Sequence, residues 1–412
     1  MIIRYEHISE DLMKKLFVVL IIIQNIIFAN EKITLHRYNP KHLMSVKNRI
    51  NNNAKEIIPS YKYLMKLAKQ NFKNGPYSVM QKPITPPSGD KHDYMSLSPY
   101  WWPDPEKESG LPYIRRDGEV NPEREKYDKR PFANLCETVS ILSMAYYFSD
   151  KQKYAARTAL LIKTWFINDE TKMNPNLNFG QGVRGKSDGR SVGIIEVKNL
   201  IEVMDAISLI QKSKYWTEDD QRKMELWLSE FLNWLLTDEL GIEEGNRLNN
   251  HGSWYDVTTS YIAYYIGELE VTKEIISNFA LKRIATQVES DGRQPHELER
   301  TKAFSYSLFN LRAQILAANL GEKLGIDIWN FTSENGGNIK KEIEFLIPFA
   351  IKEKEWPYLQ ISDWHSCHEN MFMLLRICSN KYKEPEYERL ILKIPGINTE
   401  KSIFNLVYPK KY

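Results

Sequence analysis

Helical periodicity dominates this chain after residue 40. Apolar residues recur at spacings of three and four in eleven segments, at about 43–73, 132–149, 151–167, 193–211, 217–236, 256–269, 272–289, 303–323, 338–352, 366–379 and 384–393. Such spacing places apolar side chains along one face of a helix. Strand-like alternation is nearly absent, and the only strand we expect is a short one from Ile403 to Val407. The sequence therefore predicts an all-α protein.

The connections between these segments narrow the architecture. Successive helices joined by short connections pack as antiparallel neighbours. No sequence repeat recurs at a fixed period, which argues against a regular solenoid. We therefore expect an (α/α) toroid, an incomplete barrel of antiparallel helix hairpins. No linker rich in Pro, Gly and Ser divides the chain, so residues 30–412 are expected to form a single domain.

Three long stretches break the helical pattern, at 74–131, 168–192 and 241–255. Long irregular loops inside compact domains are usually functional. On a helical toroid we expect them to gather at one end and wall a cleft.

The N-terminus resembles a signal peptide. Met13-Lys14-Lys15 precedes an apolar run from Leu16 to Ile23, and Ala29 offers a small residue for cleavage. The run is too short for a comfortable membrane span. We expect residues 1–29 to be a signal peptide, with Met13 as an alternative start, and the protein to be periplasmic or secreted in a bacterium. The alternative is a buried N-terminal helix.

Charge and cysteine content exclude several classes of protein. The 56 basic and 53 acidic side chains nearly balance at +3, so the basic excess typical of nucleic-acid binding is absent. The three cysteines lack zinc-site spacing, and His365, Cys367 and His368 are too little evidence for a metal. We expect no metal, no cofactor and no nucleic-acid partner.

The segment Gly180 to Ser187 matches the phosphate-binding pattern GxxxxGK[ST] letter for letter. Such a loop needs a buried strand before it and a helix directly after it. The preceding Met173 to Phe179 is rich in Asn and Pro, and Asp188-Gly189-Arg190 continues the loop. We therefore expect no nucleotide binding.

Two clusters carry residues suited to one reaction. Asn249-Asn250-His251-Gly252 stands at the end of a polar loop, and the stretch from His296 to Tyr306 leads into a helix. Arg300 and Tyr306 are six residues apart, so they converge only if Arg300 lies in the loop before the first helical turn. Asn, His, Arg and Tyr together match β-elimination across the C4–O4 bond of a uronic acid.

In that reaction the carboxylate beside C5 must be neutralised before H5 becomes acidic enough to remove. Asn250, His251 or Arg300 would supply the neutralising groups. Tyr306 would take H5 and protonate O4, with its pKa lowered by Arg300. Each residue also has an ordinary interpretation: Asn250 as a helix cap, His251 and Tyr306 as core residues, and Arg300 as the partner of Glu297 and Glu299.

At these residues the sequence resembles the alginate lyase superfamily of polysaccharide lyases. The resemblance covers most of residues 80–380 and is carried by Ser98-Pro99-Tyr100-Trp101-Trp102-Pro103-Asp104-Pro105, the loop from Gln181 to Glu196, Asn249 to Gly252, and Arg300 to Tyr306. It implies an (α/α) toroid, an acidic polysaccharide substrate, and catalytic roles for Asn250, His251, Arg300 and Tyr306. The Arg-to-Tyr spacing differs from that of the best-known mannuronate lyases. Glucuronan is therefore an alternative substrate to alginate.

Further side chains are candidates for contacts with the sugar chain. Aromatic rings stack on sugars, and cationic or amide groups meet carboxylates and hydroxyls. The candidates are Tyr100, Trp101, Trp102, Gln181, Arg184, Arg190, Trp254 and His296.

Two other functions compete with a lyase. An (α/α)-toroid glycoside hydrolase would use two carboxylates such as Asp256 and Glu299. An exported glycan-binding protein would keep the aromatic loops but need neither Tyr306 nor His251.

Overall fold

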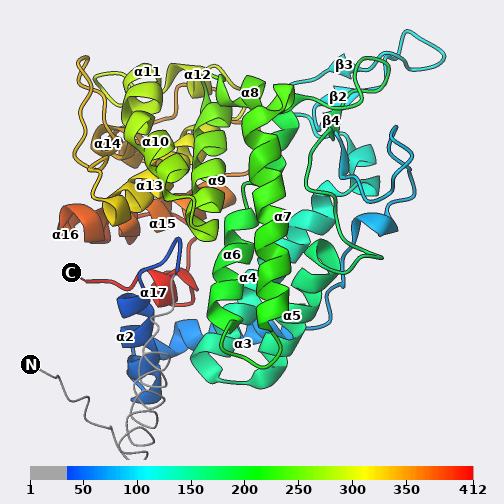
Figure 1. The fold of residues 1–412 in the computed structure, drawn as a ribbon. Coiled ribbons are helices and arrows are strands. Elements are labelled where there is room, and N and C mark those ends of the chain that lie inside the picture. The colour runs from blue at the N-terminus through cyan, green and yellow to red at the C-terminus, as the bar shows by residue number, and fades with distance from the viewer. Residues whose placement is uncertain (1–34, 412) are drawn as a thin grey trace, which may run out of the picture. The chain divides into compact units, whose positions relative to one another are not determined.

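Two layers of antiparallel helices build the fold (Figure 1). The structure is a computed structural model that describes residues 35–411, so the expected signal peptide lies outside the described residues. The inner helices contact one another in chain order, and they are α4 (Lys129–Ser149), α6 (Leu200–Ile210), α9 (Asn250–Ile266), α13 (Ala303–Leu324) and α15 (His365–Tyr382). Each is followed by an outer helix, and these are α5 (Gln152–Phe166), α7 (Glu218–Thr237), α10 (Leu269–Phe279), α14 (Ile339–Ala350) and α16 (Pro385–Ile391). The predicted incomplete (α/α) toroid is confirmed.

Burial explains why the helices divide into two layers. All of α6 except Glu202 is buried, as expected for a helix covered on every side. Helix α10 buries only Thr272, Ile276 and Phe279, which lie on one face. Helix α6 is therefore apolar around its circumference, whereas α10 is amphipathic.

The helix boundaries differ in places from those expected. The predicted helix at 43–73 is two helices, α2 (Pro40–Asn51) and α3 (Ile58–Asn71), and the expected loop 241–255 begins within a short helix, α8 (Glu239–Gly245). The strand predicted from Ile403 to Val407 is wrong, because Phe404–Val407 is a short helix, α17. The remaining short helical elements are η1 (Val79–Gln81), η2 (Pro122–Lys126), η3 (Ser191–Val197), η4 (Ala280–Ile284), α11 (Ala285–Gln287) and α12 (Pro295–Leu298). No helix among the described residues has the length and apolar character needed to cross a membrane.

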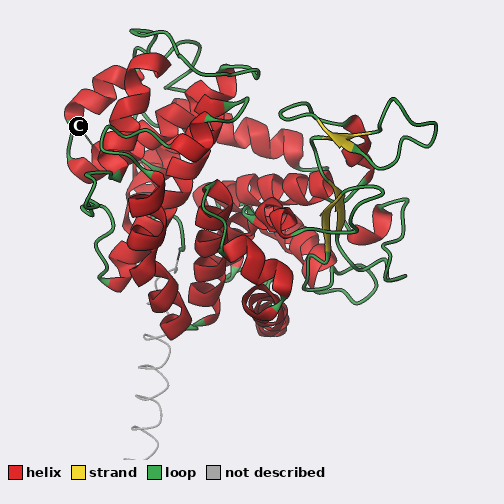
Figure 2. Cartoon of the chain, turned by 90° about the horizontal axis from the view of Figure 1, so that it is seen from above, coloured by secondary structure: helices red, strands yellow, loops and turns green. Residues whose placement is uncertain are grey.

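Four short strands lie in the long loops and were not predicted. Strand β1 (Met95–Leu97) pairs in parallel with β4 (Phe179–Gly182), and β2 (Trp101–Trp102) pairs antiparallel with β3 (Ile114–Arg115). Strands β2 to β4 lie at the same end of the molecule as α8 and α12, the upper end in Figure 1, and the loops project from the helices on one side in Figure 2. The loops therefore gather at one end of the toroid, as expected.

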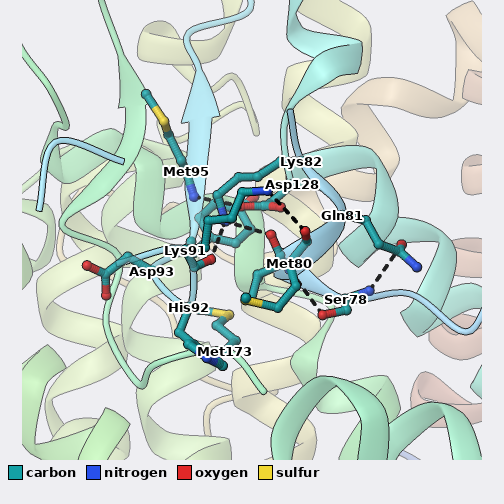
Figure 3. A network of polar contacts seen from close by, with 12 residues as sticks. Ser78, Met80, Gln81, Lys82, Lys91, His92, Asp93, Met95, Asp128 and Met173 are labelled. Carbon is teal, nitrogen blue, oxygen red and sulfur yellow. Dashed lines mark hydrogen bonds and ion pairs between the residues drawn. The ribbon is translucent and has the colours of Figure 1, made fainter. Parts of the chain in front are cut away.

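A buried polar network fastens the first long loop to the start of α4 (Figure 3). The Lys82 ammonium donates to the carbonyls of Val79 and Lys91 at 2.8 and 2.7 Å and lies 3.1 Å from Asp128 Oδ2. That carboxylate also accepts the Met95 backbone N–H at 2.9 Å. The contacts fix the loop directly before the residues that reach the candidate site.

Candidate active site

The Tyr306 hydroxyl is the centre of the first cluster. It accepts a hydrogen bond from Arg300 Nη2 at 3.0 Å and lies 3.1 Å from the Tyr100 hydroxyl. The Arg300 guanidinium carbon is 4.1 Å from the centre of the Tyr306 ring. Arg300 precedes α13, which starts at Ala303, so the two side chains converge as the sequence required.

Asp117 holds Arg300 in this position. Its carboxylate accepts from Arg300 Nη2 at 2.9 Å, from the Thr301 hydroxyl at 3.0 Å and from Arg115 Nη2 at 2.7 Å. These bonds favour the charged carboxylate and lower the pKa of Asp117, although partial burial opposes them. Next to it Gly118 has φ +79°, and a Cβ there would lie 2.5 Å from Thr301 Oγ1, so glycine lets the loop approach this closely. Asp117 was not among the predicted site residues, because it lies 183 positions from Arg300 in the chain and no local pattern links the two.

The pKa of Tyr306 is raised, which corrects the expectation of a lowered one. Burial is the main cause, and the neighbouring Tyr100 adds to it. Arg300 acts in the expected direction and lowers the pKa, but it does not outweigh burial. In the substrate-free protein Tyr306 is therefore a phenol, ready to donate a proton.

His251 is held by a second buried acid. Its Nδ1 lies 2.6 Å from Oε1 of Glu244, a fully buried residue of α8. Because a carboxylate only accepts hydrogen bonds, the proton sits on Nδ1, and Nε2 of the neutral ring is left as an acceptor. Arg247 adds positive charge near Glu244, with Nε 3.9 Å from Oε2. Neither Glu244 nor this tautomer was predicted.

Asn250 faces a third buried acid. Its backbone N–H and its Nδ2 donate to the two carboxylate oxygens of Glu297 at 2.8 and 2.7 Å. Asn250 is fully buried, and its Oδ1 has no partner. The expected direct contact with a substrate carboxylate is therefore corrected: in this geometry Asn250 presents no exposed donor. Asn250 is not the cap of the helix either, because the residue that caps α9 is Asn249.

The clusters share one electrostatic environment. Burial raises the pKa of Glu297 overall, whereas its two hydrogen bonds from Asn250 and the charge of Arg300 lower it. Gly252 follows His251 because a Cβ there would lie 2.1 Å from the Arg247 carbonyl oxygen. The two sequence clusters thus meet around Glu297 at the loop end of the toroid.

The predicted aromatic contacts Trp101 and Trp102 lie half-buried on β2 and are surrounded by cations. Lys186 Nζ is 4.5 Å and the Arg190 guanidinium carbon 5.7 Å from the Trp101 ring centre. Trp102 donates its Nε1–H to the Glu119 carbonyl at 3.0 Å. Both rings stay candidates for stacking on a sugar.

Tyr100 has a different contact from the stacking that was expected. Its hydroxyl belongs to the Tyr306 cluster, and Lys302 Nζ lies 5.5 Å from its ring centre. The contact between the Tyr100 and Tyr306 hydroxyls joins residues that are 206 positions apart in the chain. Tyr100 is therefore placed beside Tyr306 rather than out along the loop.

The loop at 180–190 is fastened by its own predicted site residues. Gln181 is buried with φ +48°, its backbone N–H donates to Ser96 Oγ at 2.7 Å, and its carbonyl accepts from Arg190 Nε at 3.0 Å. Arg190 also donates to Ser98 Oγ at 2.6 Å. Arg184 is exposed, 3.4 Å from the Tyr113 hydroxyl. Of the three predicted site residues in this loop, only Arg184 is exposed.

The phosphate-loop pattern forms a tight turn. Val183 and Ser187 pair as an antiparallel bridge, and Lys186 is turned toward Trp101. The next helical element, η3, starts at Ser191, four residues beyond the pattern. The segment therefore forms a tight hairpin turn without the helix that a phosphate-binding loop needs directly after it.

Two predicted substrate contacts lie elsewhere. Trp254 is 2% exposed, donates to the Phe309 carbonyl at 3.1 Å and stacks on the Phe309 ring, so the prediction that it binds substrate is wrong. The NNHG pattern did not indicate that Trp254 is buried, because His251, three residues before it, is itself partly exposed. His296 is exposed on α12, with no contact that ties it to the Tyr306 cluster.

Of the two carboxylates that a glycoside hydrolase would use, Asp256 and Glu299, the first is not available to a substrate. Asp256 is buried and accepts from Arg283 Nε at 2.7 Å, with Lys282 at 3.6 Å. A carboxylate neutralised in this way supports the core of α9 and cannot serve a sugar as acid or base. Glu299 is exposed.

The described residues contain no group of three or more His, Cys, Asp or Glu arranged to hold a metal ion. His368 is buried and His365 is exposed. Cys136, Cys367 and Cys378 are buried free thiols.

Comparison with known proteins gives the family and relatives of the same fold. The family model described as alginate lyase matches residues 78–356. A crystal structure of an alginate lyase from Bacteroides ovatus is 38% identical, covering 91% of this chain and 99% of its own, with a TM-score of 0.87. Alginate lyase A1-III from Sphingomonas species A1 shares the fold at 14% identity and a TM-score of 0.52, covering 85% of this chain and 96% of its own. A histidine-to-alanine variant of that enzyme, in complex with a tetrasaccharide, gives 15% identity and a TM-score of 0.54, covering 86% of this chain and 96% of its own. No curated protein matches the chain.

Proposed function

We propose a substrate for this chain, which belongs to the alginate lyase family and is a polysaccharide lyase. The proposed substrate is a β-1,4-linked polyuronate, and alginate with its polymannuronate blocks is the first candidate. The observation that carries the proposal is the contact of the Tyr306 hydroxyl with Arg300, beside a loop that bears further cations. A proton donor next to a fixed positive charge suits an anionic sugar whose O4 must be protonated as it leaves. Glucuronan, cleaved by the same mechanism, is the alternative substrate.

Charge around the candidate site supports an acidic substrate. Lys186 and Arg190 flank Trp101, and Arg184 extends from the same loop. Neutralising the carboxylate of the uronate makes removal of H5 easier, since the dianionic intermediate would otherwise carry two adjacent charges. In the proposed mechanism Arg300 supplies this neutralisation, joined by His251 when its ring is protonated, and no metal or cofactor takes part.

The stereochemistry of the polymer decides which group removes H5. In β-mannuronate and β-glucuronate, H5 and O4 lie on the same side of the ring, so one residue can serve both atoms. In α-guluronate they lie on opposite sides, and a second base is needed. Tyr306 is proposed as base and acid in the first case. The free His251 Nε2 is proposed as the base in the second, with Tyr306 as the acid.

The state of Tyr306 sets a condition on the first case. Its raised pKa means that the hydroxyl has to lose its proton before it removes H5. Binding changes the surroundings of the hydroxyl, because an arriving sugar replaces water next to Arg300 and Tyr100. The acid role needs no such step.

The test is an ultraviolet absorbance assay with polymannuronate, polyguluronate, glucuronan and carboxyl-reduced polymer. Elimination leaves a C4–C5 double bond that absorbs, whereas hydrolysis leaves none. We expect absorbance to rise with at least one acidic polymer, to stay flat with the reduced polymer, and to persist in the presence of EDTA. Equal cleavage of the reduced polymer would refute the proposal that the site recognises carboxylates, and metal-dependent recovery after EDTA would refute the metal-free mechanism.

A further inference from the structure

A second pocket lies behind the segment that carries Tyr306. It has a volume of about 690 Å³ and is formed by the end of α14, the segment that follows it and the start of α15. Its aromatic walls are Phe349, Trp356, Tyr358 and Trp364. The Trp356 ring centre is 5.0 Å from that of Phe349 and 5.1 Å from that of Tyr358. None of Asn250, His251, Arg300 and Tyr306 lines it.

Two polar atoms in this aromatic pocket have no partner. Trp356 Nε1 and His368 Nε2 are both buried and unpaired, and His368 is only 5% exposed. The other ring nitrogen of His368 interacts with the Pro395 carbonyl, and burial lowers the pKa of the imidazole. The neutral ring of His368 therefore leaves an acceptor at Nε2 without a partner, and Trp356, which lines the same pocket, leaves an indole donor without one. Buried polar groups without partners are uncommon in folded proteins.

The rim of the pocket adds positive charge. Lys352 and Lys354 line it and are exposed, and the Lys352 charge acts on His368. Glu353 and Glu355 also line the pocket, and Glu353 is paired with Lys393 at 3.2 Å, so three lysines face two acids. The pocket thus offers flat aromatic surfaces, one donor, one acceptor and free ammonium groups.

We propose that this pocket is a second saccharide-binding site that takes an acidic oligosaccharide. A sugar ring stacks on an aromatic face, and adjacent hydroxyls can accept from an indole N–H while donating to an imidazole nitrogen. The volume lies within the range of small-ligand sites, which combine apolar walls with a few placed polar groups. The ligand class rests on the proposed function, since a stretch of the same polyuronate that is not being cleaved would supply both the sugar rings and the carboxylates for the lysines.

The pocket is joined to the catalytic segment by backbone contacts. Gln360 lines the pocket, and its Oε1 accepts from the backbone N–H groups of Phe304 and Ser305 at 3.0 and 3.3 Å, in the first turn of α13. The Ile361 N–H donates to the Thr301 carbonyl at 3.0 Å. A polymer held in the pocket would therefore be fixed close to the helix end that bears Tyr306.

The proposal is tested by NMR on the full chain carrying Tyr306→Phe, so that the ligand is not consumed. The reporter is the Trp356 indole N–H signal, identified by its loss when Trp356→Phe is added. This second change keeps an aromatic ring at the position but removes the indole N–H together with part of the ring. The probes are a mannuronate tetrasaccharide and a neutral β-linked glucose tetrasaccharide.

We expect the Trp356 signal to shift and saturate with the acidic probe, and Lys352→Ala to weaken the apparent affinity at least threefold. Lys383→Ala is the matched control, because Lys383 is also exposed and has φ +55°, close to the +58° of Lys352. The same apparent affinity in both lysine variants, or equal binding of the neutral probe, would overturn the acidic-ligand assignment.

The outcomes also separate this proposal from the proposed function. A Trp356 signal that does not move, while wild-type protein cleaves polyuronate, overturns the pocket alone. A signal that shifts with the acidic probe, while wild-type protein cleaves no polyuronate, supports the pocket and refutes the lyase substrate.

Discussion

Replacing Asp117 with Asn tests whether the long-range contact to Arg300 organises the candidate site. The substitution keeps the side-chain size but removes the charge and one of the two acceptor oxygens. Asp117 now receives bonds from Arg300, Thr301 and Arg115. A hydrogen bond to a charged group contributes about 1.5–3 kcal/mol. The lower part of that range applies, because the Asp117 side chain is 24% exposed and solvent screens it.

The expected consequence is kinetic. Losing about 1.5 kcal/mol of orientation at Arg300 corresponds to a fall in kcat of about tenfold, at about 1.4 kcal/mol per factor of ten. KM should change less, because the loop cations that meet the polymer are untouched. The assay is initial-rate absorbance on polymannuronate, with thermal unfolding measured alongside to show that the fold persists.

The matched control is Asp169→Asn, which breaks an exposed ion pair with Lys172. Surface pairs of this kind contribute little, so its kcat should equal that of the wild type. Because the pKa of Asp117 is lowered, the carboxylate is charged throughout the neutral range and the defect should not vary between about pH 6 and 8. A normal kcat for Asp117→Asn would refute the argument that this loop positions Arg300.

Three further predictions follow from the buried titratable groups. Burial lowers the pKa of His36 from 6.5 to about 4, so the folded state prefers the neutral ring; stability is complete above pH 6.5 and falls by up to about 3 kcal/mol as the pH drops to 4. Denaturant unfolding of His36→Gln should lack this loss, while exposed His296→Gln retains it, and parallel pH curves for all three proteins would contradict the prediction. The raised pKa of Tyr306 predicts that kcat/KM on polymannuronate increases with pH above neutrality, as the phenolate becomes populated, and a flat or falling alkaline limb would exclude Tyr306 as the base. Glu244→Gln removes the negative partner of His251, and we expect a larger loss of kcat on polyguluronate than on polymannuronate; equal losses on both polymers would argue against His251 as a separate base.

The sequence was most informative where the relevant contacts are local. The helix pattern gave the toroid because successive helices joined by short connections pack as antiparallel neighbours. Arg300 and Tyr306 could be joined in advance because a residue just before a helix can reach its first turns. The NNHG pattern was placed at the end of a polar loop, but α9 starts at Asn250, inside the loop expected at 241–255.

The remaining contacts depend on how distant segments meet. Asp117 and Tyr100 reach the site from the first long loop, and no pattern in the chain marks which of its many polar residues does so. Glu244 was overlooked because the short helix α8 was expected to be loop. Trp254 was misassigned since local sequence does not show which face of an inner helix is covered. The pKa of Tyr306 was misjudged because burial, which is a property of the whole fold, outweighs its charged neighbour.

The most direct test of the account is ultraviolet absorbance during incubation of alginate with wild-type protein and with Tyr306→Phe. The variant removes one hydroxyl and keeps the ring beneath Arg300, so the protein should fold and still bind oligosaccharide. We expect wild-type protein to generate the absorbing unsaturated product and the variant to lose at least a hundredfold in rate, as befits removal of a general acid. Undiminished absorbance from the variant would remove Tyr306 from the mechanism, and cleavage by the wild type without absorbance would show that the reaction is not an elimination.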